Sequence, residues 1–184
     1  MKIICSAILL GVLVFSGCKK QDVQEPEKAD EQQGNRKTDT DRDLNCYHGI
    51  DRQTRKELQQ ARAMTAKYKH IANAFKDQYE DINVVVPNMG YHFMRKPIVD
   101  ATFDISKPEI LVYNKNVKGD FELVAVEYAV PIELTPNKAP EGFTGEKDEW
   151  ERNMGFGLWL LHAWVWKYNP EGVFHHTNPL VQLR

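Results

Sequence analysis

The sequence predicts an α+β fold in which one long N-terminal helix packs on an antiparallel sheet of about four or five strands. Two observations carry this prediction. Between Thr54 and Tyr79 apolar residues recur at steps of three or four, which is the helical period. After Pro87 the period changes to that of strands, and no second helical pattern interrupts them. A helix followed by a run of strands is typical of α+β proteins.

The predicted helix is continuous and amphipathic. Thr54 and Glu57 have the spacing of a capping box, which would start the helix at Thr54. Its apolar stripe consists of Leu58, Ala61, Met64, Tyr68, Ala72, Phe75 and Tyr79. His70 lies beside this stripe, so we expect its ring to be solvated.

The predicted strands are rich in aromatic and β-branched residues. They cover residues 91–94, 109–113, 121–130 and 158–167, with a short edge strand at 84–86. Lys118-Gly119-Asp120 predicts a hairpin turn between two of them, and Asn169-Pro170-Glu171-Gly172 predicts a tight turn after the last one. The connection 131–156 is long and charged. It fits either a loop folded over one end of the sheet or a passive insertion.

The N-terminus resembles a bacterial lipoprotein signal peptide. Residues 1–17 hold one lysine and an apolar run too short to span a bilayer, followed by Ser16-Gly17-Cys18. Lipidation is therefore predicted at Cys18, although Phe15 departs from the usual leucine. The alternatives are an uncleaved anchor or ordinary secretion. After processing, Cys46 would be the one remaining cysteine, which leaves no internal disulfide.

A tether and one globular domain would follow. Residues 18–45 are highly charged and lack aromatic side chains, which predicts disorder, and residues 46–184 form the predicted α+β domain. The expected partner is a membrane, through the lipid on Cys18. Lys19 stands where an aspartate would favour inner-membrane retention, so the outer membrane is the predicted location. A net charge of −2 gives no support to nucleic-acid binding.

Three predicted strands each place an ionisable side chain among apolar neighbours: His92, Glu127 and His162. Such side chains need partners when they are buried. Two histidines and a carboxylate could bind zinc or another divalent metal. They could equally form a hydrogen-bonded or ion-paired network that only fixes the core, or serve general acid/base chemistry or small-ligand binding. The sequence has no motif of fixed spacing, such as HExxH, that would decide between these alternatives.

The last predicted strand also carries a possible binding surface. Trp164 and Trp166 share the face of His162 if the strand is regular, so they could stack on a sugar ring or simply fill the core. His175 and His176 would point apart in a strand, which favours surface positions over one shared ion. The sequence contains no nucleophile elbow and no phosphate-binding loop, so no catalytic residue is predicted and an enzymatic activity is neither supported nor excluded.

Several linked motifs resemble an uncharacterised family of secreted bacterial proteins. They are MGYHFM, PEILVY, LVAVEYAVP, LHAWVWKYNPEGVF and NPLV, which extend over roughly residues 88–181. The chain reads Met94-Arg95-Lys96-Pro97 where the family often has Asn-Pro. The resemblance implies that His92, Glu127, His162, Trp164, Trp166, Asn169 and Pro170 match family motif positions. It implies no particular activity.

Overall fold

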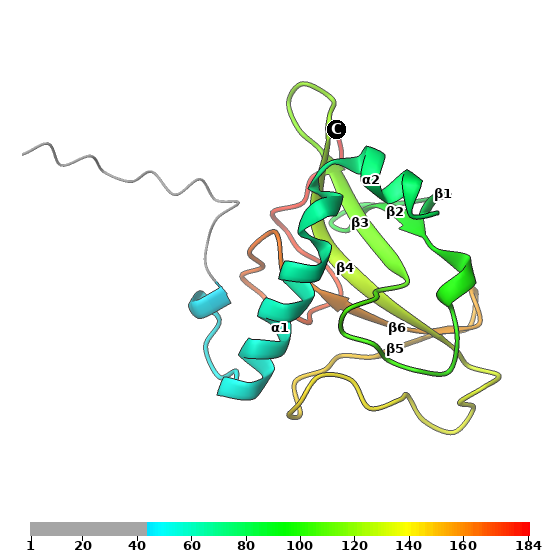
Figure 1. Cartoon of the computed structure of the whole chain (residues 1–184). Helices are drawn as coiled ribbons and strands as arrows, with labels where there is room; N and C mark the ends of the chain where they lie inside the picture. Colours follow the sequence, from blue (N-terminus) through cyan, green and yellow to red (C-terminus); the bar gives the residue numbers. More distant parts are fainter. Residues whose placement is uncertain (1–43) are drawn as a thin grey trace, which may run out of the picture. The chain divides into compact units, whose positions relative to one another are not determined.

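The computed structural model describes residues 44–184, and their architecture is α+β, as predicted (Figure 1). A six-stranded antiparallel sheet has the order β1-β2-β3-β4-β6-β5. The strands are β1 (Glu80–Val86), β2 (Gly90–Met94), β3 (Ile110–Lys115), β4 (Phe121–Pro131), β5 (Glu151–Asn153) and β6 (Leu158–Ala163). No helix within residues 44–184 is long and apolar enough to cross a membrane.

The sheet has more strands than the four or five that we predicted. The additional strand is β5, which lies inside the segment 131–156 that the sequence presented as a loop, and it pairs with β6 through Arg152 and Trp159. Three residues are too few for a visible alternation of apolar and polar side chains. The predicted turn at Lys118-Gly119-Asp120 is confirmed, since Asn116 accepts hydrogen bonds from the backbone N–H groups of Lys118 and Asp120.

The prediction of one continuous helix is wrong. The chain forms α1 (Arg52–Thr65), a 3-10 turn (Ala66–Lys69) and the short α2 (Ile71–Lys76), with extended backbone at His70 between the last two. Within this break the Thr65 hydroxyl donates to the Ala61 carbonyl and accepts from the Trp166 indole, while the Tyr68 carbonyl accepts a 2.7 Å hydrogen bond from Tyr113. Tyr113 of β3 and Trp166, which follows β6, thus satisfy the Tyr68 carbonyl and the Thr65 hydroxyl at the break in the helix.

The capping box predicted at Thr54 is also wrong. Asp51 is the N-cap residue, and its carboxylate accepts from the N–H groups of Gln53 and Thr54. Thr54 and Glu57 bind the segment 131–156 instead. Glu57 accepts from the backbone N–H and the hydroxyl of Thr144 at 2.7 and 2.6 Å, and the Thr54 hydroxyl donates to the Thr144 carbonyl. The segment 131–156 is therefore hydrogen-bonded to α1. Of the two alternatives given for it, this agrees with a folded loop.

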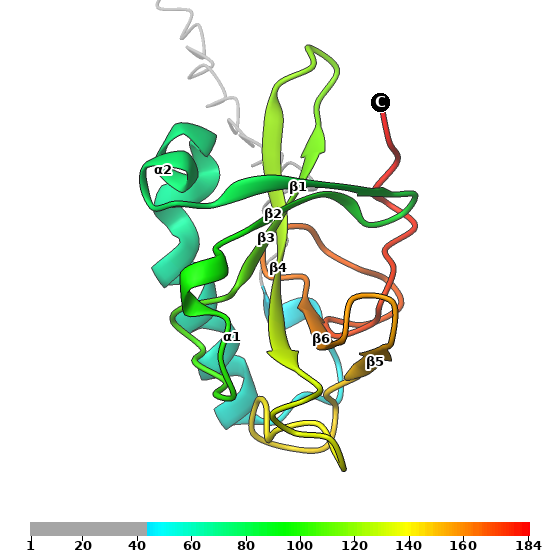
Figure 2. The same ribbon diagram turned by 90° about the vertical axis from the view of Figure 1, so that its right-hand side faces the viewer.

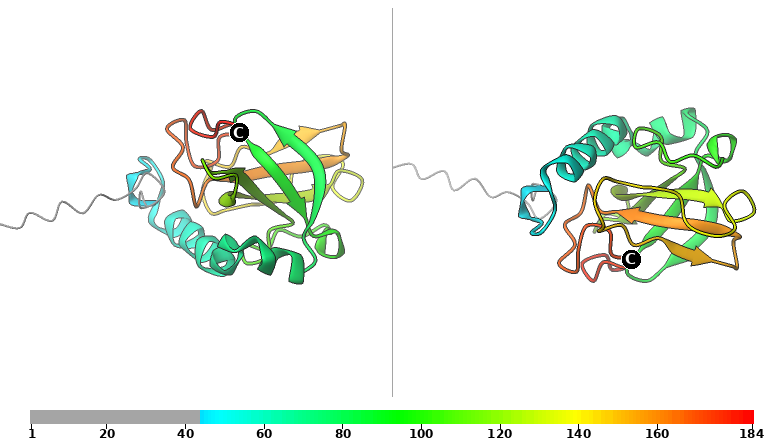
Figure 3. Two further views of the ribbon diagram at one scale, coloured as in Figure 1. Left: turned by 90° about the horizontal axis from the view of Figure 1, so that it is seen from above. Right: turned by 90° about the horizontal axis from the view of Figure 1, so that it is seen from below.

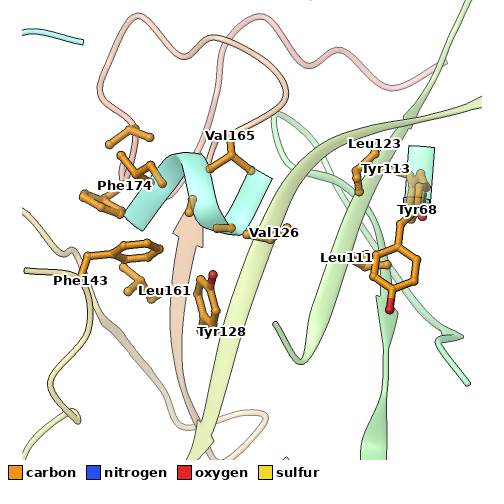
Figure 4. Packing of buried hydrophobic residues seen from close by; sticks show 14 of the residues in the cluster. Tyr68, Leu111, Tyr113, Leu123, Val126, Tyr128, Phe143, Leu161, Val165 and Phe174 are labelled. Atoms are coloured by element: carbon orange, nitrogen blue, oxygen red, sulfur yellow. Dashed lines mark hydrogen bonds between the residues drawn. The ribbon is translucent and has the colours of Figure 1, made fainter. Parts of the chain in front are cut away.

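Different segments of the chain pack against the two faces of the sheet. The helices pack on one face and the C-terminal segment runs along the other (Figure 2). On the helix side, Tyr68, Leu111, Tyr113, Val126, Tyr128, Phe143 and Leu161 belong to one large buried cluster (Figure 4). The other face holds a smaller apolar cluster of Ile110, Val112, Val124, Ala125, Ala129, Leu160, Trp164 and Val181. The ionisable residues singled out above lie on this second face.

The sheet is strongly twisted, so that β1 and β2 run across β4 rather than beside it (Figures 2 and 3). The predicted signal peptide and nearly all of the predicted tether lie outside the described residues. The domain itself begins earlier than the predicted boundary at Cys46, because Leu44 is 3% exposed and belongs to the main core. Cys46 is an exposed free thiol.

Candidate metal centre

Strand pairing brings the three predicted site residues together. Glu127 on β4 is directly opposite His162 on β6, and on its other side it pairs with Ile110 of β3. His92 on β2 reaches Glu127 across β3. All three side chains point to the face away from the helices, because the alternation of each strand places them there. They are 1 to 4% exposed.

The ligand atoms of this cluster lie close together without ordinary hydrogen bonds between them. Glu127 Oε1 is 3.4 Å from His162 Nδ1, and Glu127 Oε2 is 3.7 Å from His92 Nε2. Each residue offers one ligand atom such that all three atoms lie within 4.8 Å of one another. Charge-assisted hydrogen bonds are about 2.7 to 2.9 Å long, so both contacts are too long for that class.

A β-bulge in β1 orients His92. Between the pairs Asp81 with Phe93 and Val85 with Tyr91 the register shifts, and Asn83 adopts a φ of 57°. The bulge takes the Val84 carbonyl out of the ladder and directs it to His92 Nδ1 at 3.0 Å. Nδ1 is therefore the protonated nitrogen, since a carbonyl only accepts. Nε2 is left with a lone pair that faces Glu127.

His162 has a more apolar environment. Its ring stacks on Trp164 with centroids 5.9 Å apart and an interplanar angle of 14°. Nε2 of His162 is buried and has no hydrogen-bond partner within residues 44–184. An unpaired buried nitrogen costs free energy, and native structures keep such groups chiefly where they serve a function or meet a bound ligand.

Burial also controls the charges of the cluster. It raises the pKa of Glu127 to about 8, with a further contribution from the negative charge of Glu151. It lowers the pKa of His92, and it lowers that of His162 well below the usual value with added repulsion from His92 and His176. At neutral pH the metal-free cluster is therefore uncharged. A divalent cation would favour the carboxylate and neutral imidazoles, which are the forms that bind metals.

A cavity of about 220 Å³ opens onto His92 and Glu127. All six strands contribute to its wall, including the edge strands β1 and β5, which the twist of the sheet brings to the same space. The apolar part of the wall consists of Ile82, Val84, Val86, Met89, Met94, Ile110, Phe156, Leu158 and Leu160. The cluster is thus buried but accessible from one side.

Two further ionisable residues line this cavity, and the sequence analysis placed neither of them at the site. Glu151 and His176 line the opening, where Glu151 Oε2 lies 2.9 Å from His176 Nδ1 in an ion-pair contact. The ring of His176 also meets the ring of His162 edge-on with centroids 5.2 Å apart. The predicted surface position of His176 is confirmed, because its side chain is 41% exposed. The proximity of its ring to the His162 ring follows from the chain reversal after β6. The turn of this reversal was predicted, but the position of His176 next to His162 was not.

The two tryptophans do not form one platform. The strand predicted for 158–167 ends at Ala163, where the Trp164 N–H donates to the Val173 carbonyl and the Val165 N–H donates to the Ala163 carbonyl. This tight turn breaks the alternation. Trp164 stays on the His162 side and is 1% exposed, whereas Trp166 packs on the helix side and donates to Thr65. Trp166 therefore lies outside the cavity.

The turn that reverses the chain is the predicted one. The Gly172 N–H donates to the Asn169 carbonyl, and Gly172 has a φ of 132° that favours glycine. Val173 and Phe174 then return to the core, as expected. Asn169 is buried and bonds Thr177 and Glu171, which makes it a structural residue.

Comparison of the chain with models of known protein families, with curated proteins and with solved structures found no match.

Proposed function

We propose that the protein binds a divalent metal ion, zinc in the first instance, through His92, Glu127 and His162. The observation that carries the proposal is the spacing of the ligand atoms. Tetrahedral zinc with bonds of about 2.0 to 2.1 Å separates neighbouring ligand atoms by about 3.4 Å. The two contacts of Glu127 measure 3.4 and 3.7 Å. Each length is closer to that separation than to a charge-assisted hydrogen bond. The two contacts involve the two different oxygens of the carboxylate, and one ligand atom from each residue lies within 4.8 Å of the others.

Two features of the surroundings support the same proposal. The Val84 carbonyl fixes the tautomer of His92 that presents Nε2 to the cluster, as the outer partners of metal-binding histidines generally do. The cavity adjoins Glu127 and His92, so a metal held there would keep a coordination position open to a small molecule. Two histidines, one carboxylate and an open position characterise catalytic rather than purely structural zinc sites. A metal ion there would supply Lewis acidity.

Metal content is the measurement that tests the proposal. We expect the protein, purified without chelators and without an affinity histidine tag, to contain about one equivalent of zinc or another divalent metal by elemental analysis. His92→Ala and His162→Ala should each lose most of it, because two remaining ligands hold zinc poorly. His70→Ala is the matched control, since His70 is exposed and lies far from the cluster in the fold. Folded protein that binds no metal at neutral pH would contradict the proposal.

We further propose that the domain is held at a bacterial membrane, with the outer membrane as the favoured location. The residues that support this are Ser16-Gly17-Cys18 after the apolar run and the charged segment behind them. Cys18→Ser is expected to move the protein from the membrane fraction to the soluble fraction and to abolish incorporation of labelled palmitate. Retention of the label by this variant would refute lipidation at Cys18. The resemblance to the secreted family remains a prediction from the motifs.

A further inference from the structure

The cavity has the distribution of polarity that an amphiphilic ligand requires. Its wall consists mainly of aliphatic, methionine and phenylalanine side chains, whereas ionisable groups occur at its floor and at its opening. Phe156 at the opening is 58% exposed and Val86 is half-buried. Exposed apolar surface that rims a concave site is typical of a binding site for an apolar group.

The charge of the proposed metal site, which His92 and Glu127 expose to the cavity, determines which polar group the ligand can carry. Two neutral imidazoles and the Glu127 carboxylate around a divalent cation give a net charge of +1 in a buried, apolar setting. A buried net charge is costly unless a counter-charge accompanies it. A monoanion that takes the open coordination position neutralises the site, whereas a neutral ligand leaves the charge and a dianion reverses it.

We infer that the cavity binds an aliphatic monocarboxylate, with its carboxylate on the metal and its alkyl chain against the apolar wall. This inference rests on the proposed metal site and names the ligand class that the site takes. Ile82, Val84 and Val86 of β1 form one side of the wall, and Leu158 and Leu160 of β6 form the other. The sheet is twisted (Figure 3), and residues of both β1 and β6 line the same cavity.

Calorimetric titration of the zinc-loaded protein with butanoate, hexanoate and octanoate tests the inference. Each buried methylene group should tighten binding roughly fourfold, so each step of two methylenes should lower the Kd by about tenfold or more. Octan-1-ol, which has the alkyl chain without the charge, should bind far more weakly than octanoate. A Kd independent of chain length would overturn the inference, because the wall would then not contact the ligand.

Two neighbouring residues of β1 provide a matched pair of variants. Val86→Asp places a carboxylate in the wall and should weaken octanoate binding at least tenfold without changing the zinc content. Val85→Asp makes the same substitution on the opposite side of the strand, where Val85 is 44% exposed and lines no part of the cavity, and it should leave octanoate binding unchanged. Equal weakening by both variants would contradict the location of the ligand. Unchanged zinc content in both serves as the check on folding.

The outcomes separate the inference from the proposed function. Octanoate binding that requires zinc and disappears in His92→Ala supports both. One equivalent of zinc without any octanoate binding overturns the inference and leaves the metal site standing. Octanoate binding of equal strength to metal-free protein overturns the inference as well, because the carboxylate would then not be on the metal. Failure to bind zinc overturns both.

Discussion

Replacement of Glu127 by glutamine is expected to stabilise the metal-free protein while it abolishes metal binding. In the metal-free protein burial raises the pKa of Glu127 to about 8, so at pH 7 folding forces this carboxyl group to take up a proton. Glutamine has nearly the same shape and needs no proton. We expect the free energy of unfolding to rise by about 3 kcal/mol at pH 7, because pH 7 lies about 2.5 units above the ordinary pKa of 4.5 and below the raised pKa of about 8.

The difference in unfolding free energy between Glu127→Gln and the unchanged protein should increase with pH. Above pH 4.5 the unfolded carboxyl group loses its proton, whereas the folded one keeps it until about pH 8. The folded state then binds more protons, so the contribution of Glu127 to stability falls as the pH rises through this window. The advantage of Glu127→Gln should therefore grow from nearly zero at pH 4.5 by up to about 1.4 kcal/mol per pH unit. Contributions from Glu109 and Asp148, whose pKa values are also raised, cancel in the difference.

Urea unfolding with a chelator present, at several values between pH 5 and pH 8, measures this difference. Glu122→Gln is the control, because Glu122 lies on the same strand but is exposed. A loss of about 3 to 5 kcal/mol in Glu127→Gln would instead identify a structural ion pair, since breaking a buried pair costs that much. This outcome would favour the reading in which the cluster only fixes the core.

Replacement of Trp164 by alanine is expected to lower the free energy of unfolding by about 3 to 5 kcal/mol, the usual cost of removing a buried tryptophan. The indole is 1% exposed, stacks on His162 and donates a 2.6 Å hydrogen bond to the His175 carbonyl. The variant would lose this packing and leave the carbonyl without its partner. Chemical denaturation of the metal-free protein measures the loss.

Trp166→Ala provides the comparison for Trp164→Ala. The Trp166 indole is only half-buried, so its removal should cost less. It should also leave metal content unchanged, because Trp166 lies on the helix side of the sheet. A sugar platform built from both rings predicts the opposite pattern, in which Trp164→Ala weakens glycan binding with little loss of stability.

The strand pattern was enough to predict the cluster, because alternation fixes which face a side chain takes. His92, Glu127 and His162 each interrupt an apolar run, and Glu127 and His162 turned out to be direct partners across β4 and β6. Their common burial follows from the same patterns. The distances within the cluster do not, because they depend on the register of strands that are far apart in the chain.

The features that the sequence did not reveal arise from tertiary contacts. The bulge that directs the Val84 carbonyl to His92 depends on a register shift and on a left-handed residue at Asn83. The helix breaks where Thr65 and Tyr68 bond side chains of distant segments. β6 ends at Ala163 because the Trp164 N–H pairs with Val173 after the chain has reversed. In each case a contact distant in sequence outweighs a local preference.

We propose that His92, Glu127 and His162 form a functional site whose metal-free form lowers the stability of the fold. A buried carboxyl group with a raised pKa and a buried nitrogen without a partner both destabilise the metal-free fold. A bound cation would relieve the first and would give the cluster a reason to exist, since binding to the folded state alone stabilises that state. Natural proteins commonly accept such a cost at functional sites.

X-ray absorption at the zinc edge of the zinc-loaded protein tests this reading most directly, because it identifies the atoms that surround the metal. The expected first shell contains two imidazole nitrogens and at least one carboxylate oxygen at about 2.0 to 2.2 Å. His92→Ala should reduce the imidazole contribution to one ring in any residual bound zinc. A shell that contains sulfur at about 2.3 Å would place the metal on a cysteine thiolate, and a shell without imidazole would place it away from His92 and His162. Either result would contradict the proposed site.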